Sequence, residues 1–454
     1  MKRTEKDYLG TIEIEEDALY GINSLRAREN FPITKRGLDP QLIKNIVLVK
    51  KACATVNKEN GDLDETKADA IIEACEEIIN GKHQDAFIVD LIQGGAGTSA
   101  NMNVNEVIAN LAIIKLGGRP GQYEMVHPID DVNMHQSTND VIPTAARLTV
   151  MDKTRELIKT LDYLKEELDK KAEQYEDIYR LGRTQLQDAV PMKASRSFEA
   201  YSSMIRRALI KIENVLEHMK HVNLGGTAIG SGIASNRYYQ DHVVERLSQL
   251  SGYELSRFDD LYDGTQNVDD FASVSAEIRV CALSLSKMAN DIRLLSSGPL
   301  SGYREYDLPD KQSGSSIMPG KINPVIPEAL NQAAFLVIGN DVTVMMAAEA
   351  GQLELNAFLP VLLFQLFESI DVLNNSVRTF TDNCIRDLIV LEERCAYNVE
   401  HSASLATALI PIIGYEKASQ IVREAQKSGK TVFEVAEEYG ILRREIEDRL
   451  NPLD

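Results

Sequence analysis

The segment 313–325 places two adjacent hydroxyls, an amine and an amide within a few residues: Ser315, Ser316, Lys321 and Asn323. Glycine and proline residues between them oppose a regular helix or strand, and long helical patterns flank the segment on both sides. Long irregular loops in folded proteins are usually functional or disordered, and the apolar residues of this one argue against disorder. We therefore expect a mobile active-site loop at 313–325.

Other hydroxyl and amide side chains occur in short segments before or between helical patterns. These are Thr98, Ser137, Thr138, Asn139, Thr184 and Gln185. Such donors can hold a small polycarboxylate and stabilise the charge that forms when a proton next to a carboxylate is removed. The same donors favour ionisation of a serine, which is otherwise a weak base. Each segment also fits a structural role, because short polar residues cap helices and glycines form tight turns.

Composition excludes several classes of function. The chain has 454 residues, and 49 Lys and Arg against 69 Asp and Glu give a net charge of −20, which repels nucleic acids and anionic membranes. A local cluster of donors still allows an anionic substrate to bind. The seven histidines are scattered and the cysteines form no CxxC pair, so we expect no metal site. No GxSxG sequence occurs, which argues against an α/β-hydrolase, and no strand precedes the Gly-x-Gly at 230–232, which argues against a dinucleotide site.

The sequence also indicates where the protein works. Five cysteines without disulfide-like spacing indicate a reduced protein with buried thiols. The N-terminus has no apolar stretch of the kind found in signal peptides. The most apolar stretch, 333–348, is interrupted by Asn340 and Asp341 and is shorter than the roughly 20 residues that a membrane span needs. We therefore expect a buried core helix there and a cytoplasmic location.

Helices must position the polar groups. Pro40 opens a helix with an apolar side and with Lys50 and Lys51 on its other side, and a second helix is expected over 66–79. Three later stretches keep the near-heptad apolar spacing of long bundle helices, namely 150–168, 205–219 and 274–295. The helix after Pro327 is apolar nearly all round, so other helices must surround it. Because one chain would struggle to cover every such face, we expect an oligomer.

Five segments together resemble the aspartase/fumarase superfamily. They read QGGAGTSANMNVNE at 93–106, HPIDDVNMHQSTND at 127–140, GRTQLQDAVP at 182–191, NLGGTAIGSG at 223–232 and GSSIMPGKINP at 314–324. The resemblance covers nearly the whole chain. It implies a mainly α fold of three domains: a mostly helical N-terminal domain at 1–136, a central long-helix bundle at 137–390 that carries the serine loop, and a small helical C-terminal domain at 391–454. It also implies a homotetramer with the bundle at its core and with each site assembled from three subunits.

The resemblance implies a role for each polar residue. Ser315 would be the base that removes a Cβ proton, and Lys321, Asn323 and Thr184 would hold one carboxylate. Glu328 matches a glutamate that pairs with the residue at position 185 when that residue is histidine. The carboxylate that becomes the charged intermediate would be held by Ser137, Thr138 and the loop backbone around Ser316. The leaving group would lie near Thr98, Asn139 and Gln185.

The implied reaction is the reversible anti-elimination of ammonia from L-aspartate to give fumarate, without a cofactor. Gln185 stands where fumarases have histidine, and the glycine-rich segment at 94–98 is also similar to aspartases. Fumarate hydration and elimination from a substituted aspartate or another succinyl compound are the alternatives. A catalytically silent structural homologue is the remaining interpretation, and the presence of Ser315, Lys321 and Asn323 argues against it.

Six residues depart from the superfamily pattern and keep a changed substrate open. They are Asp131, His135, Arg196, Leu300, Leu359 and Ile412. For any one of them, neutral drift beside the site is the simpler interpretation. Together they raise the chance of an altered pocket, and we hypothesise that Asp131 and Arg196 form a new charge pair there.

Overall fold

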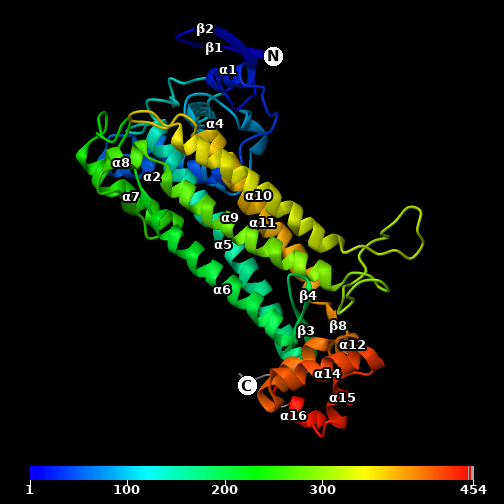
Figure 1. Cartoon of the computed structure of the whole chain (residues 1–454). Helices are drawn as coiled ribbons and strands as arrows, with labels where there is room; N and C mark the ends of the chain where they lie inside the picture. The colour runs from blue at the N-terminus through cyan, green and yellow to red at the C-terminus, as the bar shows by residue number, and fades with distance from the viewer. Residues whose placement is uncertain (448, 451–454) are drawn as a thin grey trace. The chain divides into compact units, whose positions relative to one another are not determined.

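The computed structural model describes residues 1–447, 449 and 450. In this part of the chain helices dominate and the strands are short (Figure 1), which confirms the expected mainly α fold. The contacts divide the chain into two compact units. Unit 1 comprises Met1–Leu157, Lys211–Arg279 and Leu336–Asp371, and unit 2 comprises Ile158–Ile210, Val280–Phe335 and the chain from Val372 onward.

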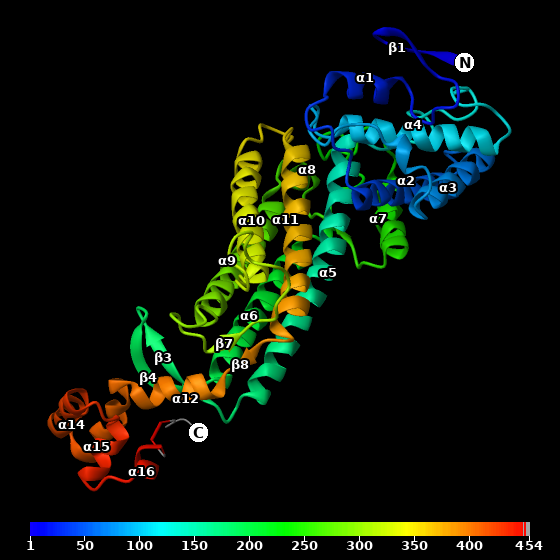
Figure 2. The same ribbon diagram turned by 90° about the vertical axis from the view of Figure 1, so that its right-hand side faces the viewer.

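Five long helices supply segments to both units. They are α5 (Thr138–Gln174), α6 (Ser195–His218), α9 (Asp269–Leu295), α10 (Val325–Glu349) and α11 (Leu359–Phe380), and they lie side by side in both ribbon views (Figures 1 and 2). The near-heptad stripes predicted from the sequence lie in α5, α6 and α9. Leu157, Leu161, Leu164 and Leu168 of α5 are fully buried, so the apolar stripe of this helix faces the core as its spacing predicts.

Unit 1 contains further α-helices and strands. They are β1 (Lys2–Asp7), β2 (Gly10–Glu15), α1 (Ile22–Asn30), α2 (Pro40–Asn60), α3 (Glu65–Ile79), α4 (Thr98–Lys115), β5 (His221–Val222), α7 (Arg237–Ser251), β6 (Ser256–Arg257) and α8 (Leu261–Gln266). β1 and β2 form an antiparallel hairpin, and β5 pairs in parallel with β6. α2 packs against α3 and α7, and α3 packs against α4.

The helix α2 begins as predicted, but one of its residues lies on the other side. Pro40 is its first residue, and the Asp39 carboxylate caps it by accepting from the backbone N–H groups of Gln41 and Leu42. Lys50, expected on the solvent side, is 0% exposed. The expectation was wrong because Lys50 follows Ile46 by four residues, and this spacing places both on the same helix face.

Unit 2 contains the remaining strands and α-helices. They are β3 (Tyr179–Thr184), β4 (Gln187–Lys193), β7 (Tyr306–Asp307), β8 (Ile389–Val390), α12 (Glu392–His401), α13 (Ile410–Ile413), α14 (Tyr415–Ser428), α15 (Val432–Glu438) and α16 (Arg443–Glu447). β3 and β4 form an antiparallel hairpin, and β7 pairs with β8. The helices after residue 391 surround their own apolar core, which includes Leu405, Ile421 and Phe433. No helix or strand interrupts residues 308–324, and this segment extends from the helices as an open loop (Figure 1).

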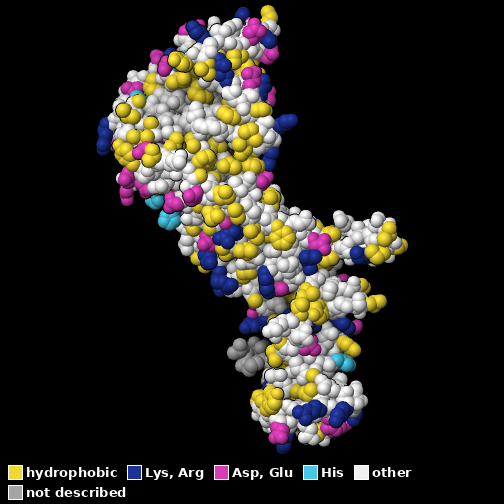
Figure 3. All heavy atoms as spheres, turned by 45° about the horizontal axis from the view of Figure 1, so that its top comes forward, with side chains coloured by type: hydrophobic (Ala, Val, Ile, Leu, Met, Phe, Trp, Pro, Cys, Tyr) yellow, Lys and Arg dark blue, Asp and Glu magenta, His cyan; other side chains and the backbone are white. Residues whose placement is uncertain are grey.

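The helix α10 is less covered than its composition predicts. Leu330, Ala334, Val337 and Val344 are buried along one stripe, but the opposite face is open to solvent. That face exposes Phe335, Leu336, Val342, Met345 and Met346. Figure 3 shows hydrophobic side chains among the surface atoms of the long helices. The expectation of a fully buried core helix is therefore wrong for the single chain. By length and composition α10 could also cross a membrane, but core helices of soluble proteins pass the same test.

Candidate active site

The serine loop holds Ser315 by backbone hydrogen bonds. The Ser315 Oγ accepts from the N–H groups of Ile317 at 3.2 Å and Met318 at 2.9 Å. Two donors that converge on one oxygen favour its ionised form. The Asn323 amide donates to the Gly314 carbonyl at 2.6 Å, and the Gly314 N–H donates to the Lys321 carbonyl at 2.9 Å. These bonds close the base of the loop and bring the predicted base and two predicted ligands into one local structure.

Lys321 supplies an uncommitted positive charge in this loop. Its side chain is exposed and makes no ion pair or hydrogen bond with the residues that the structure describes. Ile317 is 83% exposed although it is apolar. An unpaired ammonium beside hydroxyl and amide donors suits a carboxylate ligand.

The hairpin β3–β4 carries Thr184 and Gln185 at its tip. Thr184 pairs with Gln187, so the connection consists of Gln185 and Leu186 alone. Both adopt positive φ, +54° and +62°, as a two-residue type I′ turn requires. Both predicted ligands are exposed there. The sequence did not reveal this hairpin, because its turn lacks the Asn-Gly or Asp-Gly that usually marks one.

Arg183, which precedes this tip, is held by a buried carboxylate. The fully buried Glu305 accepts from Arg183 at 2.6 Å, from Arg180 at 3.0 Å and from Asn398 at 2.9 Å. Burial acts to raise the pKa of Glu305, but these three donors outweigh it and lower the pKa. Glu305 directly precedes β7, so it joins the strand that leads to the serine loop with the strand that leads to Gln185.

Glu328 has a different partner within the chain. Its Oε1 lies 3.2 Å from a guanidinium nitrogen of Arg293, which also donates to Asn331 at 3.3 Å. No interaction with Gln185 occurs among the described residues. The carboxylate therefore anchors the start of α10 to the end of α9.

In unit 1 the predicted ligands lie at the starts of α4 and α5. Ser137 caps α5, because its Oγ accepts from the Asn139 N–H at 3.2 Å, as predicted. The Asn101 amide donates to the Thr138 hydroxyl at 3.2 Å and so connects α4 with α5. Thr98 is the first residue of α4, and its hydroxyl donates to the Gly95 carbonyl at 2.7 Å. Two helix N-termini with hydroxyls suit an anion.

Asp140 fixes the cap of α5 to a neighbouring loop. Its carboxylate accepts from the N–H groups of Ser137 at 2.9 Å, Gly225 at 3.1 Å and Thr227 at 3.0 Å. Burial raises the pKa of Asp140 to about 6, against the opposing effect of these donors and of Lys50. The Asn139 amide donates to the Ala228 carbonyl at 2.8 Å in the same loop. The glycine-rich segment at 223–232 thus supports the start of α5.

Lys50 is the residue of this region that the sequence did not single out. Its ammonium donates to Oδ1 of Asn133 at 2.7 Å and to Oε1 of Gln136 at 2.9 Å. The same Asn133 oxygen accepts from Asn101 at 3.1 Å, and Asn101 donates to Thr138. Burial lowers the pKa of Lys50 to about 7. A buried cation therefore lies behind the donors at the start of α5, and the helical spacing of Lys50 from Ile46 was the sequence feature that could have revealed it.

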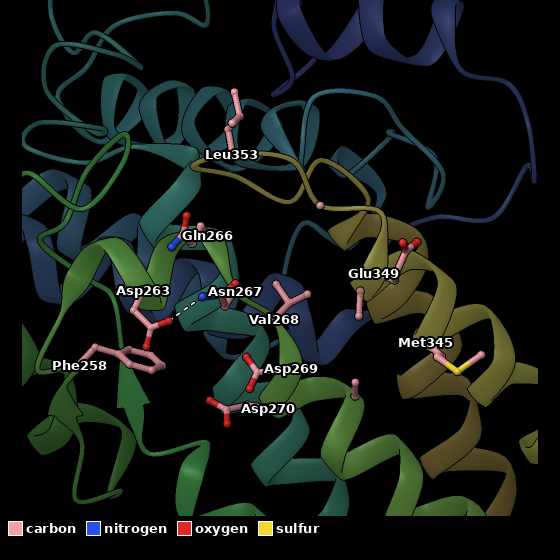
Figure 4. Close-up of a pocket in the computed structure, with 13 residues that line it drawn as sticks. Phe258, Asp263, Gln266, Asn267, Val268, Asp269, Asp270, Met345, Glu349 and Leu353 are labelled. Atoms are coloured by element: carbon pink, nitrogen blue, oxygen red, sulfur yellow. Dashed lines mark hydrogen bonds between the residues drawn. The ribbon is translucent and has the colours of Figure 1, made fainter.

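The predicted residues fall in both units. Unit 1 holds Thr98, Ser137, Thr138 and Asn139, and unit 2 holds Thr184, Gln185, Ser315, Ser316, Lys321, Asn323 and Glu328. A cavity of about 640 Å³ in unit 1 is lined by none of them. It lies between the segment 258–272 and the end of α10, and Figure 4 shows carboxylates of Asp269, Asp270 and Glu349 on its walls. Among the described residues, no three His, Cys, Asp or Glu side chains are grouped as metal ligands would be.

The structure shows the surroundings of the six departures. Asp131 pairs with Lys67 at 2.9 Å, and Arg196 pairs with Glu199 at 2.6 Å. The hypothesised Asp131–Arg196 pair is therefore wrong for this structure, because each side chain is taken by a nearer partner. His135, at φ +63°, meets Oδ1 of Asn57 through Nδ1 at 2.9 Å. Of the others, Leu300 is exposed, Leu359 is buried and Ile412 packs against the C-terminal core.

Comparison with known proteins decides the family. The model of a lyase family matches residues 10–339, and that of the fumarase C C-terminus matches residues 405–453. The chain belongs to this lyase family. The superfamily predicted from the five segments and the mainly α fold shared with its members are thereby confirmed. The aspartate ammonia-lyases among the relatives confirm the class of enzyme, a carbon–nitrogen lyase.

Relatives of this lyase match it along almost its whole length. An aspartate ammonia-lyase of Bacillus subtilis (strain 168) is 46% identical over 453 residues, which cover 100% of this chain and 95% of the relative. The crystal structure of a fumarate lyase:delta crystallin from Brucella melitensis bound to cobalt is 45% identical, has a TM-score of 0.96, and covers 100% of this chain and 99% of that chain. A class II fumarase from Schistosoma mansoni is 32% identical with a TM-score of 0.93, at coverages of 100% and 98%.

Proposed function

We propose that the protein catalyses the reversible elimination of ammonia from L-aspartate to give fumarate. The observation that carries this proposal is Ser315, whose Oγ accepts two backbone N–H groups in the same loop as Lys321, an ammonium without a partner among the described residues. The full-length relatives named aspartate ammonia-lyase support the same reaction. Gln185 supports an amine as leaving group, since fumarases carry histidine at that place in the resembling segment.

In the proposed reaction, the donors of the serine loop and those at the start of α5 have different roles. Ser315 takes the Cβ proton, and the electron pair left on Cβ is delocalised into the adjacent carboxylate as its charged aci form. The pair then forms the Cα–Cβ double bond as the Cα–N bond breaks and ammonia leaves. One carboxylate is held by Lys321, Asn323 and Thr184. The charged intermediate is stabilised by Ser137, Thr138 and the backbone around Ser316, for which one such donor contributes about 3 kcal/mol.

The remaining predicted ligands serve the amine. Thr98, Asn139 and Gln185 lie near the leaving group in this proposal, with Glu328 as a support through Arg293. No cofactor takes part. Free L-aspartate and fumarate are the small-molecule partners, and neither nucleic acid nor a membrane is one.

Catalysis in this proposal requires a homotetramer with sites shared between copies. The exposed apolar face of α10 supports association, because contiguous apolar surface of this kind usually marks an interface. The three-domain division at 1–136, 137–390 and 391–454 belongs to the same proposal, with the middle domain at the core of the tetramer. The five free, buried cysteines support a cytoplasmic location.

The test is formation of fumarate, followed by its ultraviolet absorbance, with L-aspartate or L-malate as substrate. We expect fumarate from aspartate alone, and loss of activity by about a thousandfold in Ser315→Ala, since the base of a proton transfer is removed. Ser313→Ala is the matched control, a serine of the same loop with no proposed role. Fumarate from malate would instead identify a hydratase.

A substituted aspartate is the second candidate, supported by Leu300 and Leu359, which replace an arginine and a glutamate of the pattern. A folded oligomer that is silent with aspartate and malate, but consumes fumarate with a substituted amine, would establish that alternative.

A further inference from the structure

The tip of the hairpin β3–β4 has an unfavourable backbone. Gln185 and Leu186 both have positive φ, which costs a residue with a Cβ roughly 1–2 kcal/mol. The Leu186 side chain is 59% exposed, so its burial does not hold the turn. Such conformations persist where surrounding contacts enforce them, and they concentrate at functional sites.

Tyr303 supplies contacts to this tip from another part of unit 2. Its hydroxyl donates to the Leu186 carbonyl at 3.3 Å, a long hydrogen bond, and the Arg183 guanidinium lies over its ring at 4.4 Å. Tyr303 therefore contacts Arg183, which precedes Thr184, and Leu186, which follows Gln185. The two predicted ligands lie between these contacts.

Tyr303 is itself held on both sides of its backbone. Its N–H donates to the Ser297 hydroxyl at 3.2 Å, and its carbonyl accepts from Nε of Arg394 at 3.1 Å. Arg183 is fixed in turn by the buried Glu305 at 2.6 Å. The backbone of Tyr303 is thus anchored and its ring lies against the fixed Arg183 guanidinium, whereas Gln185 and Leu186 are exposed and would otherwise be free to relax.

We propose that Tyr303 is a positioning residue that fixes Gln185 against the amino group of the substrate and so selects ammonia over larger amines. The inference rests on the proposed function, in which Gln185 lies near the leaving group. A displaced turn moves the Gln185 amide and opens space for a substituent on nitrogen. A change in position of this kind alters the choice of amine more than it alters folding.

The experiment measures addition of ammonia and of methylamine to fumarate by the oligomeric wild type, Tyr303→Phe and Tyr303→Leu. Tyr303→Phe removes the hydroxyl alone, and Tyr303→Leu removes the ring beneath Arg183 as well. We expect the ratio of kcat/KM for ammonia to kcat/KM for methylamine to fall by about threefold in Tyr303→Phe and by about tenfold in Tyr303→Leu. Changes of this size correspond to the loss of one or two weak contacts. The melting temperature should stay close to that of wild type.

Tyr397→Phe is the matched control, because it also removes one tyrosine hydroxyl from unit 2 but keeps the ring that stacks on His401 and lies against Arg394. A merely structural role would lower both rates together and leave the ratio unchanged. An unchanged ratio in folded Tyr303→Leu would overturn the proposal. Absence of any reaction of wild type with fumarate and ammonia would contradict the proposed function instead, and this is seen before any variant is compared.

Discussion

Lys50 is a buried amine whose partners are amide oxygens and not carboxylates, and burial lowers its pKa to about 7, so it is mainly cationic below that pH. Because Asn133 and Gln136 are neutral, its charge is not cancelled by a direct partner, and its potential extends toward Thr138 through Asn101. Cys53 and then Asp140 act on Lys50 by charge alone, without a hydrogen bond. At the scale of single residues, the positive charge of Lys50 makes the start of α5 more attractive to a carboxylate than a helix N-terminus would be by itself.

Replacement of Lys50 should affect both the binding of aspartate and the stability of the fold, and the two effects can be measured separately. In Lys50→Met we expect the KM for aspartate to rise about tenfold, equal to about 1.4 kcal/mol of lost attraction. The free energy of unfolding should fall by about 1 kcal/mol, because the Gln136 oxygen loses its donor whereas the Asn133 oxygen keeps that of Asn101. Steady-state kinetics and urea unfolding measure the two effects. Lys51→Met is the control, since Lys51 lies on the outer side and pairs with Glu76; equal behaviour of the two variants would contradict the role of Lys50.

Protonation of Asp140 should lower the activity of the enzyme at acid pH. Its carboxylate form accepts three N–H groups, and its pKa is about 6. As the pH falls through 6, protonation removes acceptor capacity at the α5 cap, so kcat/KM should fall. Asp140→Asn should be slow at every pH and lack this limb, which a pH profile of kcat/KM would show. Asp162→Asn, an exposed residue of the same helix, should keep the wild-type profile, and an unshifted acid limb in Asp140→Asn would exclude this assignment.

Single residues differ in how far the sequence reveals them. Ser315, Lys321 and Asn323 could be selected because their types and their irregular surroundings are visible in one segment. Their roles remain predictions. Lys50 was misplaced because a pair of adjacent lysines suggests a solvated face, although its spacing from Ile43 and Ile46 places it among buried residues. The Asp131–Arg196 pair failed for another reason: Glu199 follows Arg196 by three residues on α6, and this spacing favours the local pair.

At the scale of elements, the closed base of the serine loop depends on Gly314. A Cβ added there would lie 2.4 Å from the Lys321 carbonyl oxygen, too close for any side chain. Gly314→Ala should therefore open the loop and lower kcat by about tenfold or more. The melting temperature should barely change, because the loop buries little.

Gly37→Ala is the control for that substitution, since its nearest neighbour would be the Phe87 carbonyl at 4.0 Å. Kinetics and thermal unfolding compare the two variants. Wild-type activity in Gly314→Ala would show that the observed closure is not needed for turnover.

The elements also show where patterns succeed. Helices with strong periodicity, such as α5 and α9, were predictable because each buries one continuous stripe. The hairpin β3–β4 was not, because Gln185 and Leu186 give no turn signal and the strands do not alternate clearly. It is contacted by Tyr303 and Glu305, which are more than a hundred residues away in sequence.

At the scale of the whole molecule, the open face of α10 should decide assembly. Met346 is 64% exposed, and burial of such a side chain contributes about 2 kcal/mol. In a tetramer this contribution would recur in every copy. Met346→Glu should therefore dissociate the oligomer and abolish activity, as sedimentation and assays at several protein concentrations would show. The control is Leu9→Glu, at a 74% exposed position of the β1–β2 turn, which should change neither the assembly nor the activity. An intact, active oligomer in Met346→Glu would exclude α10 from the interface.

The composition of α10 indicated a surrounded helix, but the single chain covers only one stripe of it. Sequence could suggest that other chains complete the cover, since five large apolar side chains would otherwise remain in water. It could not show which face remains open, because that depends on how α9 and α11 pack against α10.

The exposure of the serine loop has a consequence for how the protein can be handled. A segment without helix or strand, with Lys321 and Ile317 open to solvent, is the kind of site where proteases cut folded proteins. Trypsin should cleave after Lys321 before it attacks the helices. If a dicarboxylate binds the Lys321 ammonium, the peptide bond after Lys321 becomes resistant to trypsin. The rate of cleavage at this bond would then report occupancy of the site, even in variants too slow to assay.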